Sequence, residues 1–166
     1  MAMDVEIRSG ADGDLAALVA VLGQREYFSE HLARQRDGHG VLLVAWVGGR
    51  PAGDVFLAWT PADEPEIQEH LPGVPQLTHL EVLDSVRRRG VGTALIHAAE
   101  DLARGSGHDR IALAVGLDNR NARRLYEHLG YVDWGQGTAV VSWVERDHDG
   151  PPVRSSEICD VLVKRL

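Results

Sequence analysis

Three consecutive arginines followed by two closely spaced glycines are the part of this sequence best suited to chemistry. Arg87, Arg88 and Arg89 precede Gly90-Val91-Gly92, where an expected strand passes into an expected helix. The start of a helix presents unpaired backbone N–H groups and the positive end of the helix dipole, which together bind anions. A glycine has no side chain, so a phosphate can approach the backbone closely. The pattern indicates a small phosphorylated ligand, and a tight turn without a ligand is the alternative interpretation.

Two other phosphate-binding motifs do not fit this stretch. The nucleoside triphosphate loop requires a lysine followed by serine or threonine after its last glycine, and no such lysine follows Gly90 or Gly92. The dinucleotide fingerprint requires a third glycine at position 95, where this chain has Leu95.

The overall charge argues against a nucleic acid partner. The formal net charge is −8, whereas non-specific nucleic acid binding needs a broad cationic face. The arginine cluster is therefore a local exception, which favours a small anion over a polymer. A solvated run of arginines remains the alternative for this cluster.

The remaining composition predicts a cytoplasmic protein without a membrane partner. No apolar run approaches the roughly 18 residues that cross a membrane. Asp4, Glu6 and Arg8 interrupt the first nine residues, so we expect no signal peptide there. Cys159 is the single cysteine, which excludes an internal disulfide and agrees with a reducing compartment.

The elements that position this turn can be predicted from hydrophobic periodicity. We expect strands at 5–7, 41–47, 51–59, 77–83, 110–115, 131–134 and 158–163, and helices at 15–22, 27–36, 66–71, 90–104 and 119–129. Residues 138–144 are expected to form an added strand or an arm. Residues 60–76 are expected to be a loop that contains the short helix at 66–71, and residues 146–155 are expected to be a loop. Asp12 or Asp14 is expected to cap the first of these helices. No repeat or composition break divides the chain, so we expect one domain, residues 1–166, of the α/β class with a mixed sheet.

Two blocks of the sequence resemble the GNAT superfamily of N-acetyltransferases. Residues Arg87 to Gly92 match its Gln/Arg-x-x-Gly-x-Gly/Ala signature, and Leu80-Glu81-Val82 resembles its fourth strand. Residues Asn119 to Tyr131 resemble its Asn-x-x-Ala-x-x-Leu-Tyr-x-x-x-Gly-Phe/Tyr segment. Asp84 departs from the pattern, because the family often has proline there.

The resemblance implies the acyl-CoA N-acyltransferase fold, a central mixed, mostly antiparallel twisted sheet of six to seven strands flanked by about four helices. It also implies acetyl-CoA as the acetyl donor. Main-chain groups of Leu80 and Val82 are expected to pair with the pantetheine arm of the cofactor. Asn119 is expected to contact the same arm, and Tyr126 is expected to lie near the sulfur. The pyrophosphate is expected at the turn formed by Arg87, Arg88, Arg89, Gly90, Val91, Gly92 and Thr93.

The chemistry implied is direct acetyl transfer to an amine through a tetrahedral intermediate. Tyr126 is the expected proton donor to the departing thiolate, although a tyrosine at this helical spacing could simply pack in the core. An alkylammonium is mostly protonated at pH 7, so a base is useful, and Glu81 or its strand neighbour His79 could take the proton directly or through water. His97 and Glu100 share an expected helix face without a third ligand, so we predict no metal site.

The acceptor is the least determined part of this prediction. The family usually builds the acceptor site from segments that correspond here to residues 27–36, 63–70 and 134–157. We expect a primary amine of a small molecule. A protein amino terminus or lysine is the alternative acceptor, and a non-catalytic acyl-CoA-binding regulator is the alternative function. A homodimer is possible, because dimers are common in the family.

Overall fold

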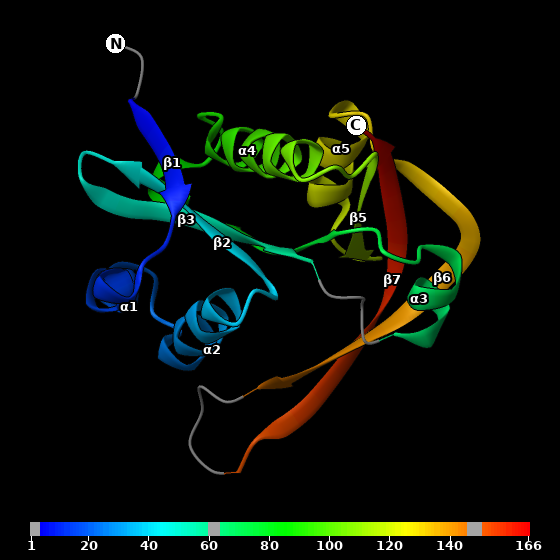
Figure 1. Cartoon of the computed structure of the whole chain (residues 1–166), viewed down its shortest axis with the longest axis horizontal. Helices are drawn as coiled ribbons and strands as arrows, with labels where there is room; N and C mark the ends of the chain where they lie inside the picture. Colours follow the sequence, from blue (N-terminus) through cyan, green and yellow to red (C-terminus); the bar gives the residue numbers. More distant parts are fainter. Residues whose placement is uncertain (1–3, 60–63, 146–150) are drawn as a thin grey trace.

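Seven strands form one sheet, in the order β1-β2-β3-β4-β5-β7-β6, within the residues that the computed structural model describes, 4–59, 64–145 and 151–166 (Figure 1). Five α-helices flank this sheet in the same residues, so the expected fold class is confirmed. The elements are β1 (Val5–Ser9), α1 (Leu15–Leu22), α2 (Arg25–Arg36), β2 (Gly40–Val47), β3 (Arg50–Ala58), α3 (Pro65–His70), β4 (Gln76–Val82), α4 (Val91–Gly105), β5 (Arg110–Gly116), α5 (Arg120–His128), β6 (Val132–Glu145) and β7 (Val153–Arg165).

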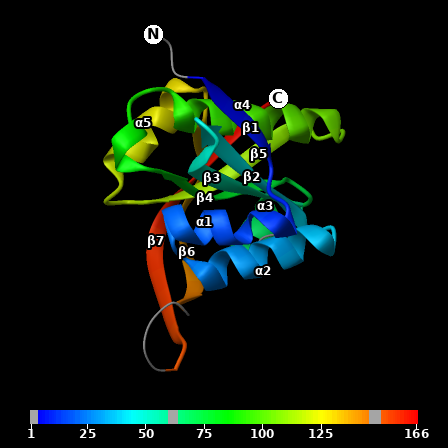
Figure 2. The ribbon, with the colours of Figure 1, turned by 90° about the vertical axis from the view of Figure 1, so that its left-hand side faces the viewer.

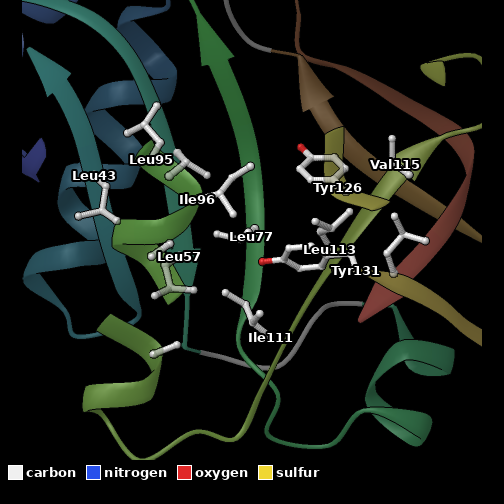
Figure 3. Close-up of a cluster of buried hydrophobic side chains, with 14 of the residues drawn as sticks. Leu43, Leu57, Leu77, Leu95, Ile96, Ile111, Leu113, Val115, Tyr126 and Tyr131 are labelled. Atoms are coloured by element: carbon white, nitrogen blue, oxygen red, sulfur yellow. The ribbon is translucent and has the colours of Figure 1, made fainter. Parts of the chain in front are cut away.

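Helices cover both faces of the sheet (Figure 2). On one face, α4 buries Leu95, Ile96 and Ala99 against the strands, because the apolar positions of this helix recur every three to four residues. Figure 3 shows Leu95 and Ile96 among the leucines of β2, β3 and β4 and the tyrosines Tyr126 and Tyr131. On the other face, α1 and α2 enclose a second core that contains Leu18 and Phe28.

The β2–β3 hairpin turns where the sequence predicts it. Gly48 and Gly49 connect the strands with φ of 58° and 76°, the left-handed conformation that two-residue hairpin turns favour.

The pairing of β4 with β5 creates the main irregularity of the sheet. β4 and β5 pair in parallel, whereas the other strand pairs of the described residues are antiparallel. Only two residue pairs join them, Gln76 with Ala112 and Leu77 with Leu113. Beyond Leu77 the two strands diverge, so the rest of β4 is left without a strand partner on that side among the described residues. An extended ligand can pair with such free backbone groups.

The C-terminal strands differ from the expectation. Residues 132–145 form a single strand, β6, so 138–144 are neither a separate strand nor a detached arm; a shift in register between Asp133 and Thr138 explains the apparent break. The last strand is longer than 158–163 and includes 153–155, which were expected to be loop. It lies between β5 and β6, and the expected loop residues 146–150 fall outside the described part of the chain.

Asp14, one of the two expected caps, is the N-cap residue of α1, but its side chain serves other partners. The Asp14 carboxylate accepts from the Ala11 N–H at 2.8 Å and pairs with Arg8 at 2.9 Å, and makes no capping hydrogen bond to α1. Asp12 pairs with Arg36 on α2. The short helix expected at 66–71 is present as α3, while residues 60–63 of the predicted loop lie outside the described residues.

None of the helices in the described residues is long and apolar enough to span a membrane.

Candidate functional site

A cleft of about 1150 Å³ opens where β4 and β5 diverge. Its walls come from α2, residues 76–80 of β4, residues 113–116 of β5, α5 and the distal part of β6, with further residues from β3, α3, α4 and β7. Residues that line it include Gln24, Tyr27, His31, Arg34, Thr78, His79, Leu80, Val115, Gly116, Asn119, Tyr126 and Trp143. Segments distant in sequence are thus brought together around one opening.

The turn before α4 has the conformation that an anion site needs. Gly90 is the N-cap residue with φ of 83°, and the bond from the Ala94 N–H to the Gly90 carbonyl, at 2.9 Å, is the first of the helix. The N–H groups of the first turn therefore have no partner within the helix. A Cβ placed on Gly90 would meet no heavy atom within 4 Å, so the space beside this backbone is open. The turn therefore has the free N–H groups and the open space that an anion site at a helix start requires.

The first turn of α4 lies directly against β4. A Cβ on Gly92 would lie 3.7 Å from the Val82 side chain and 3.9 Å from that of Leu80. Leu80 also lines the cleft, so the predicted phosphate turn and the cleft adjoin at this residue. Val82 itself does not line the cleft.

The three arginines of the turn are not equivalent. Arg87 pairs with Asp84 at 2.8 Å, and its Nε donates to the Val82 carbonyl at 3.3 Å. Arg88 and Arg89 are exposed, and neither forms an ion pair with a described residue. Arg88 also has a positive φ of 64°, which is unusual for a residue with a side chain. Two guanidinium groups are thus available for an anion, whereas that of Arg87 is already paired.

Tyr126 and Asn119 both line the cleft. The Asn119 side chain caps α5 by accepting from the Ala122 N–H at 3.3 Å. Tyr126 is 9% exposed, and burial raises the pKa of its hydroxyl to about 12. Figure 3 shows its ring beside Val115, with the hydroxyl on the side that faces β4. The hydroxyl therefore stays protonated at neutral pH and is available as a hydrogen-bond donor at the wall of the cleft.

A bulge in β4 directs His79 toward α2. Glu81 pairs with Asp54 across the sheet and Thr78 with Phe56, so two residues of β4 lie opposite one residue of β3. His79 takes a positive φ of 56° at this bulge. Bulges re-aim side chains and are frequent beside active sites.

The bulge completes a hydrogen-bonded network that the sequence did not reveal. His79 Nδ1 lies 3.1 Å from Asp54 Oδ2, and His79 Nε2 lies 3.0 Å from Gln24 Oε1. Gln24 Nε2 donates to Glu81 Oε2 at 2.6 Å, and that oxygen is 3.6 Å from His79 Nε2. Asp54 and Gln24 come from β3 and the α1–α2 junction, 25 and 55 residues away from His79.

Burial and charge act in opposite directions on this network. Burial lowers the pKa of His79, but the Asp54 and Glu81 carboxylates outweigh it, so the His79 pKa is raised. Burial raises the pKa of Asp54, which is 0% exposed, although the hydrogen bond with His79 opposes this effect. We therefore assign the charged imidazolium–carboxylate form to His79 and Asp54, because each charge stabilises the other in a buried position.

Asp54, His79 and Glu81 also form a group of potential ligand atoms within 4.8 Å of one another. The Asp54 and His79 atoms already satisfy each other in hydrogen-bond geometry, so we interpret the group as a proton-sharing network. His97 and Glu100 lie three residues apart on α4, and His97 is exposed whereas Glu100 is buried. Glu100 instead accepts from Tyr131 Oη and Lys164 Nζ, each at 2.9 Å.

The chain is similar to known proteins both in sequence and in fold. The model of the acetyltransferase (GNAT) family matches residues 14–131. An uncharacterized N-acetyltransferase of Methanocaldococcus jannaschii is 33% identical over 109 residues, which cover 66% of this chain but only 45% of that relative. The chain thus spans about half the length of this relative. An uncharacterized N-acetyltransferase of Bacillus subtilis is 28% identical over 140 residues, covering 78% of this chain and 91% of that protein.

Solved structures share the fold at lower sequence identity. The PaiA N-acetyltransferase of Thermoplasma acidophilum, solved with coenzyme A, has a TM-score of 0.69 at 16% identity, with 99% of this chain and 100% of that chain covered. The ribosomal-protein-S18-alanine N-acetyltransferase of Escherichia coli has a TM-score of 0.68 at 17% identity. This match covers 98% of this chain and 94% of that chain.

Proposed function

Since the chain belongs to the acetyltransferase (GNAT) family, we propose that it transfers the acetyl group of acetyl-CoA to a primary amine of a small molecule. The observation that carries this proposal is the divergence of β4 from β5 beside the open start of α4. Free strand edges and free helix N–H groups meet there, and one elongated ligand with an amide-containing arm and a pyrophosphate needs both. We treat residues 1–166 as one catalytic domain, because the described strands form one sheet.

The residues proposed to bind the donor follow the path of such a ligand. The backbone of Leu80 and Val82 pairs with the pantetheine arm, and Asn119 contacts it from α5. The N–H groups of the turn, from Arg88 to Thr93 and including Val91, hold the pyrophosphate, with charge from Arg88 and Arg89. We assign Arg87 a smaller part, because its guanidinium is already paired with Asp84.

The chain's own groups then manage the protons of the transfer. Acetyl-CoA supplies a thioester, whose carbonyl carbon the neutral amine attacks. The Val82 N–H is proposed to donate to the thioester oxygen, since a preorganised donor stabilises the negative charge that develops there. Tyr126 is proposed to give its proton to the thiolate, and Glu81, with its neighbour His79, to take the proton that the amine loses. This chemistry requires no metal ion.

A cationic amine suits the acceptor part of the cleft. Glu26, Glu30, Glu64 and Glu157 line it, against the two guanidinium groups of Arg34 and Arg154. This excess of carboxylates favours a positively charged acceptor. The E. coli structure is named for a protein acceptor, so a protein amino terminus or lysine is the second candidate. We expect the reaction in the cytoplasm, without a nucleic acid or membrane partner, in a monomer or a homodimer.

The test uses acetyl-CoA, a panel of small amines and an N-terminal peptide, with a thiol reagent to detect released coenzyme A. We expect thiol release with at least one small amine. Tyr126→Phe should lower kcat by about 100-fold, the usual scale of general acid catalysis, while coenzyme A affinity changes less than about twofold. Coenzyme A binding without thiol release for any acceptor would instead favour a binding regulator, and unchanged turnover would remove Tyr126 from the mechanism.

A further inference from the structure

Arg34 on α2 lines the cleft and forms no ion pair with a described residue. The other arginines that are only partly exposed in the described part of the chain, Arg8, Arg110 and Arg123, each pair with a carboxylate. A charged side chain that loses part of its water gains most from a partner of opposite charge. Arg34 is therefore the arginine of the cleft best suited to bind an anionic group of a ligand.

His31 and Phe56 hold the Arg34 guanidinium in place. His31 Nδ1 lies 2.9 Å from the Tyr27 carbonyl oxygen, so this nitrogen donates and Nε2 presents its lone pair. Arg34 Nη1 donates to that lone pair at 3.3 Å. Burial lowers the pKa of His31 to about 4, so the imidazole is neutral near pH 7 and keeps accepting. The guanidinium carbon also lies 4.9 Å from the centre of the Phe56 ring, a cation–π distance. A guanidinium held in this way loses little freedom when it binds an anion.

A carboxylate is the anion that fits this guanidinium. The planar fork of an arginine carries several N–H donors, and the contact with His31 uses one of them. Two parallel N–H groups of such a fork bind both oxygens of one carboxylate. A phosphate group fits the same fork but carries a larger negative charge, which the glutamates of the cleft repel more strongly. These glutamates are Glu26, Glu30, Glu64 and Glu157.

The distance from Arg34 to the proposed acetyl position sets the length of the acceptor. Arg34 lies about two helical turns after Tyr27, whose ring stacks on that of His79 at 3.8 Å. Two turns of helix rise about 10 Å, and His79 directly precedes Leu80, beside which the donor is proposed to lie. An extended chain of about six bonds, each of about 1.5 Å, reaches about 7–8 Å, and a charged hydrogen bond adds about 2.8 Å. An amine about six bonds from a carboxylate carbon therefore spans this part of the cleft.

Glu30 places a negative charge next to Arg34. It lies about one turn earlier on α2, lines the same cleft and forms no ion pair with a described residue. Residues four apart share a helix face, so both side chains are presented to the same part of the cleft. A carboxylate and a guanidinium that stand side by side without pairing match the ammonium and carboxylate groups on the α-carbon of an amino acid.

We propose that Arg34 binds the carboxylate of the acceptor and Glu30 its α-ammonium, so that the acceptor is a diamino acid about as long as lysine and is acetylated on its side-chain amine. This inference rests on the proposed acetyl transfer and deepens it, because it names the class of acceptor. It also gives the single half-buried cation of α2 a role in a cleft that is otherwise rich in carboxylates.

The transfer balances with this acceptor. The side-chain nitrogen forms a C–N bond to the acetyl carbon, and the C–S bond of the thioester breaks. The side-chain ammonium loses two protons in the process. One ends on the sulfur of coenzyme A, which leaves as the thiol, and the other passes to water. The α-ammonium and the carboxylate keep their charges, so the end held by Glu30 and Arg34 is unchanged by the reaction.

Three acceptors of equal length separate the parts of this proposal in the wild-type protein. Lysine has all the groups, ε-aminocaproate lacks the α-ammonium, and cadaverine lacks the carboxylate. We expect kcat/KM for thiol release to be at least about tenfold higher with lysine than with cadaverine, since hydrogen bonds to a charged group contribute on this scale. Glycine should be a poor acceptor, because its amine lies too close to its carboxylate to span the distance. Equal values for lysine and cadaverine, or a preference for glycine, overturn the proposal.

Arg34→Met keeps the unbranched apolar stem but removes the fork. It should lower kcat/KM for lysine and ε-aminocaproate by at least about tenfold and change that for cadaverine by less than about twofold. Arg34→Lys keeps the charge without the fork and should lose part of the preference, which keeps the test decisive if Arg34→Met fails to fold. Glu30→Gln should weaken lysine but not ε-aminocaproate. Arg36→Met is the matched control and should change none of these values, because Arg36 pairs with Asp12 and does not line the cleft.

Binding of hexanoate, a carboxylate without an amine, measures the Arg34 site without turnover. Calorimetry at millimolar hexanoate, with coenzyme A present, should detect binding to the wild type and none to Arg34→Met. That result together with no thiol release from any amine would reject the proposed transfer and keep the carboxylate site. Arg154 also lines the cleft, from β7, so Arg154→Met shows whether any positive charge there has the same effect. Three results overturn the proposal: an equal loss for lysine and cadaverine in Arg34→Met, the same selective loss in Arg154→Met, or no hexanoate binding to the wild type.

Discussion

Replacing Arg89 should weaken coenzyme A binding more than replacing Arg87, although the residues lie two positions apart. Arg87 is paired with Asp84 at 2.8 Å and bonded to the Val82 carbonyl, whereas Arg89 has no ion-pair partner among the described residues. A pair of opposite charges presents little net field to a ligand. Arg89→Gln therefore removes a full positive charge from the start of α4, and Arg87→Gln removes one that Asp84 already offsets.

The size of the effect follows from Coulomb's law. A guanidinium about 6 Å from one phosphate charge in water contributes 332/(80 × 6), or about 0.7 kcal/mol, and two phosphate charges give about 1.4 kcal/mol. Arg89→Gln should thus raise the Kd for coenzyme A by about tenfold at low salt, and Arg87→Gln by less than about threefold. Both residues are exposed, so neither change should lower the melting temperature.

Isothermal titration calorimetry with coenzyme A at two salt concentrations checks this reasoning. At about 1 M salt the screening length is about 3 Å, so the affinities of both variants should approach that of the wild type. An equal loss of affinity in the two variants, or a loss in Arg89→Gln that persists at high salt, would show that the pairing of Arg87 does not distinguish the arginines.

Three further changes test the fold around the site. Lys164→Met removes the cation that pairs with buried Glu100 and should lower the free energy of unfolding by about 2–3 kcal/mol in urea titrations. This loss is smaller than for a fully buried pair because the Lys164 side chain is 22% exposed. Adding Glu100→Gln should recover at least half of the loss, because no unpaired charge is then buried. The hydrogen bond from Arg8 lowers the pKa of Asp14, so Asp14 stabilises the fold above its unfolded pKa of about 3.9 and this stabilisation is lost as the pH falls through the lower folded value. Asp14→Asn should therefore cost about 0.5–1 kcal/mol at pH 7, a small value because solvent screens half-exposed Arg8, and progressively less as the pH falls through the lowered folded pKa. Gly90→Ala should cost about 1–2 kcal/mol, measured by thermal melting, because Gly90 has φ of 83°; an unchanged melting temperature would contradict the strained cap.

The helices and strands could be predicted because their signals are local, whereas phosphate binding at the turn before α4 stays a prediction. The apolar spacing of α4 specifies its buried face, and the paired glycines at 48–49 specify the hairpin turn. Tyr126 could be placed on the cleft because the resemblance covers the segment from Asn119 to Tyr131, which forms α5 and its flanks.

The partners of His79 could not be predicted from local patterns, because they are distant in sequence. Asp54 and Gln24 meet His79 only after β3 has paired with β4 and α2 has packed on the sheet. One signal was available: Asp54 interrupts an otherwise apolar strand, and a buried carboxylate needs a partner. The bulge that turns His79 toward Asp54 has no such sequence signal, since a positive φ is uncommon for every residue other than glycine and the sequence does not mark where it falls.

The position of β7 within the sheet has a consequence for the order of folding. β5 pairs with β4 at two positions only, and its long partner is β7, about fifty residues later in the chain. During synthesis, β5 and β6 therefore emerge from the ribosome before the strand that joins them exists. The first four strands and their helices can form early, because their contacts are largely closer in sequence. The wall of the cleft built by α5 and β6 then forms last, when β7 inserts, so that ligand-binding competence arrives only with the final segment of these residues.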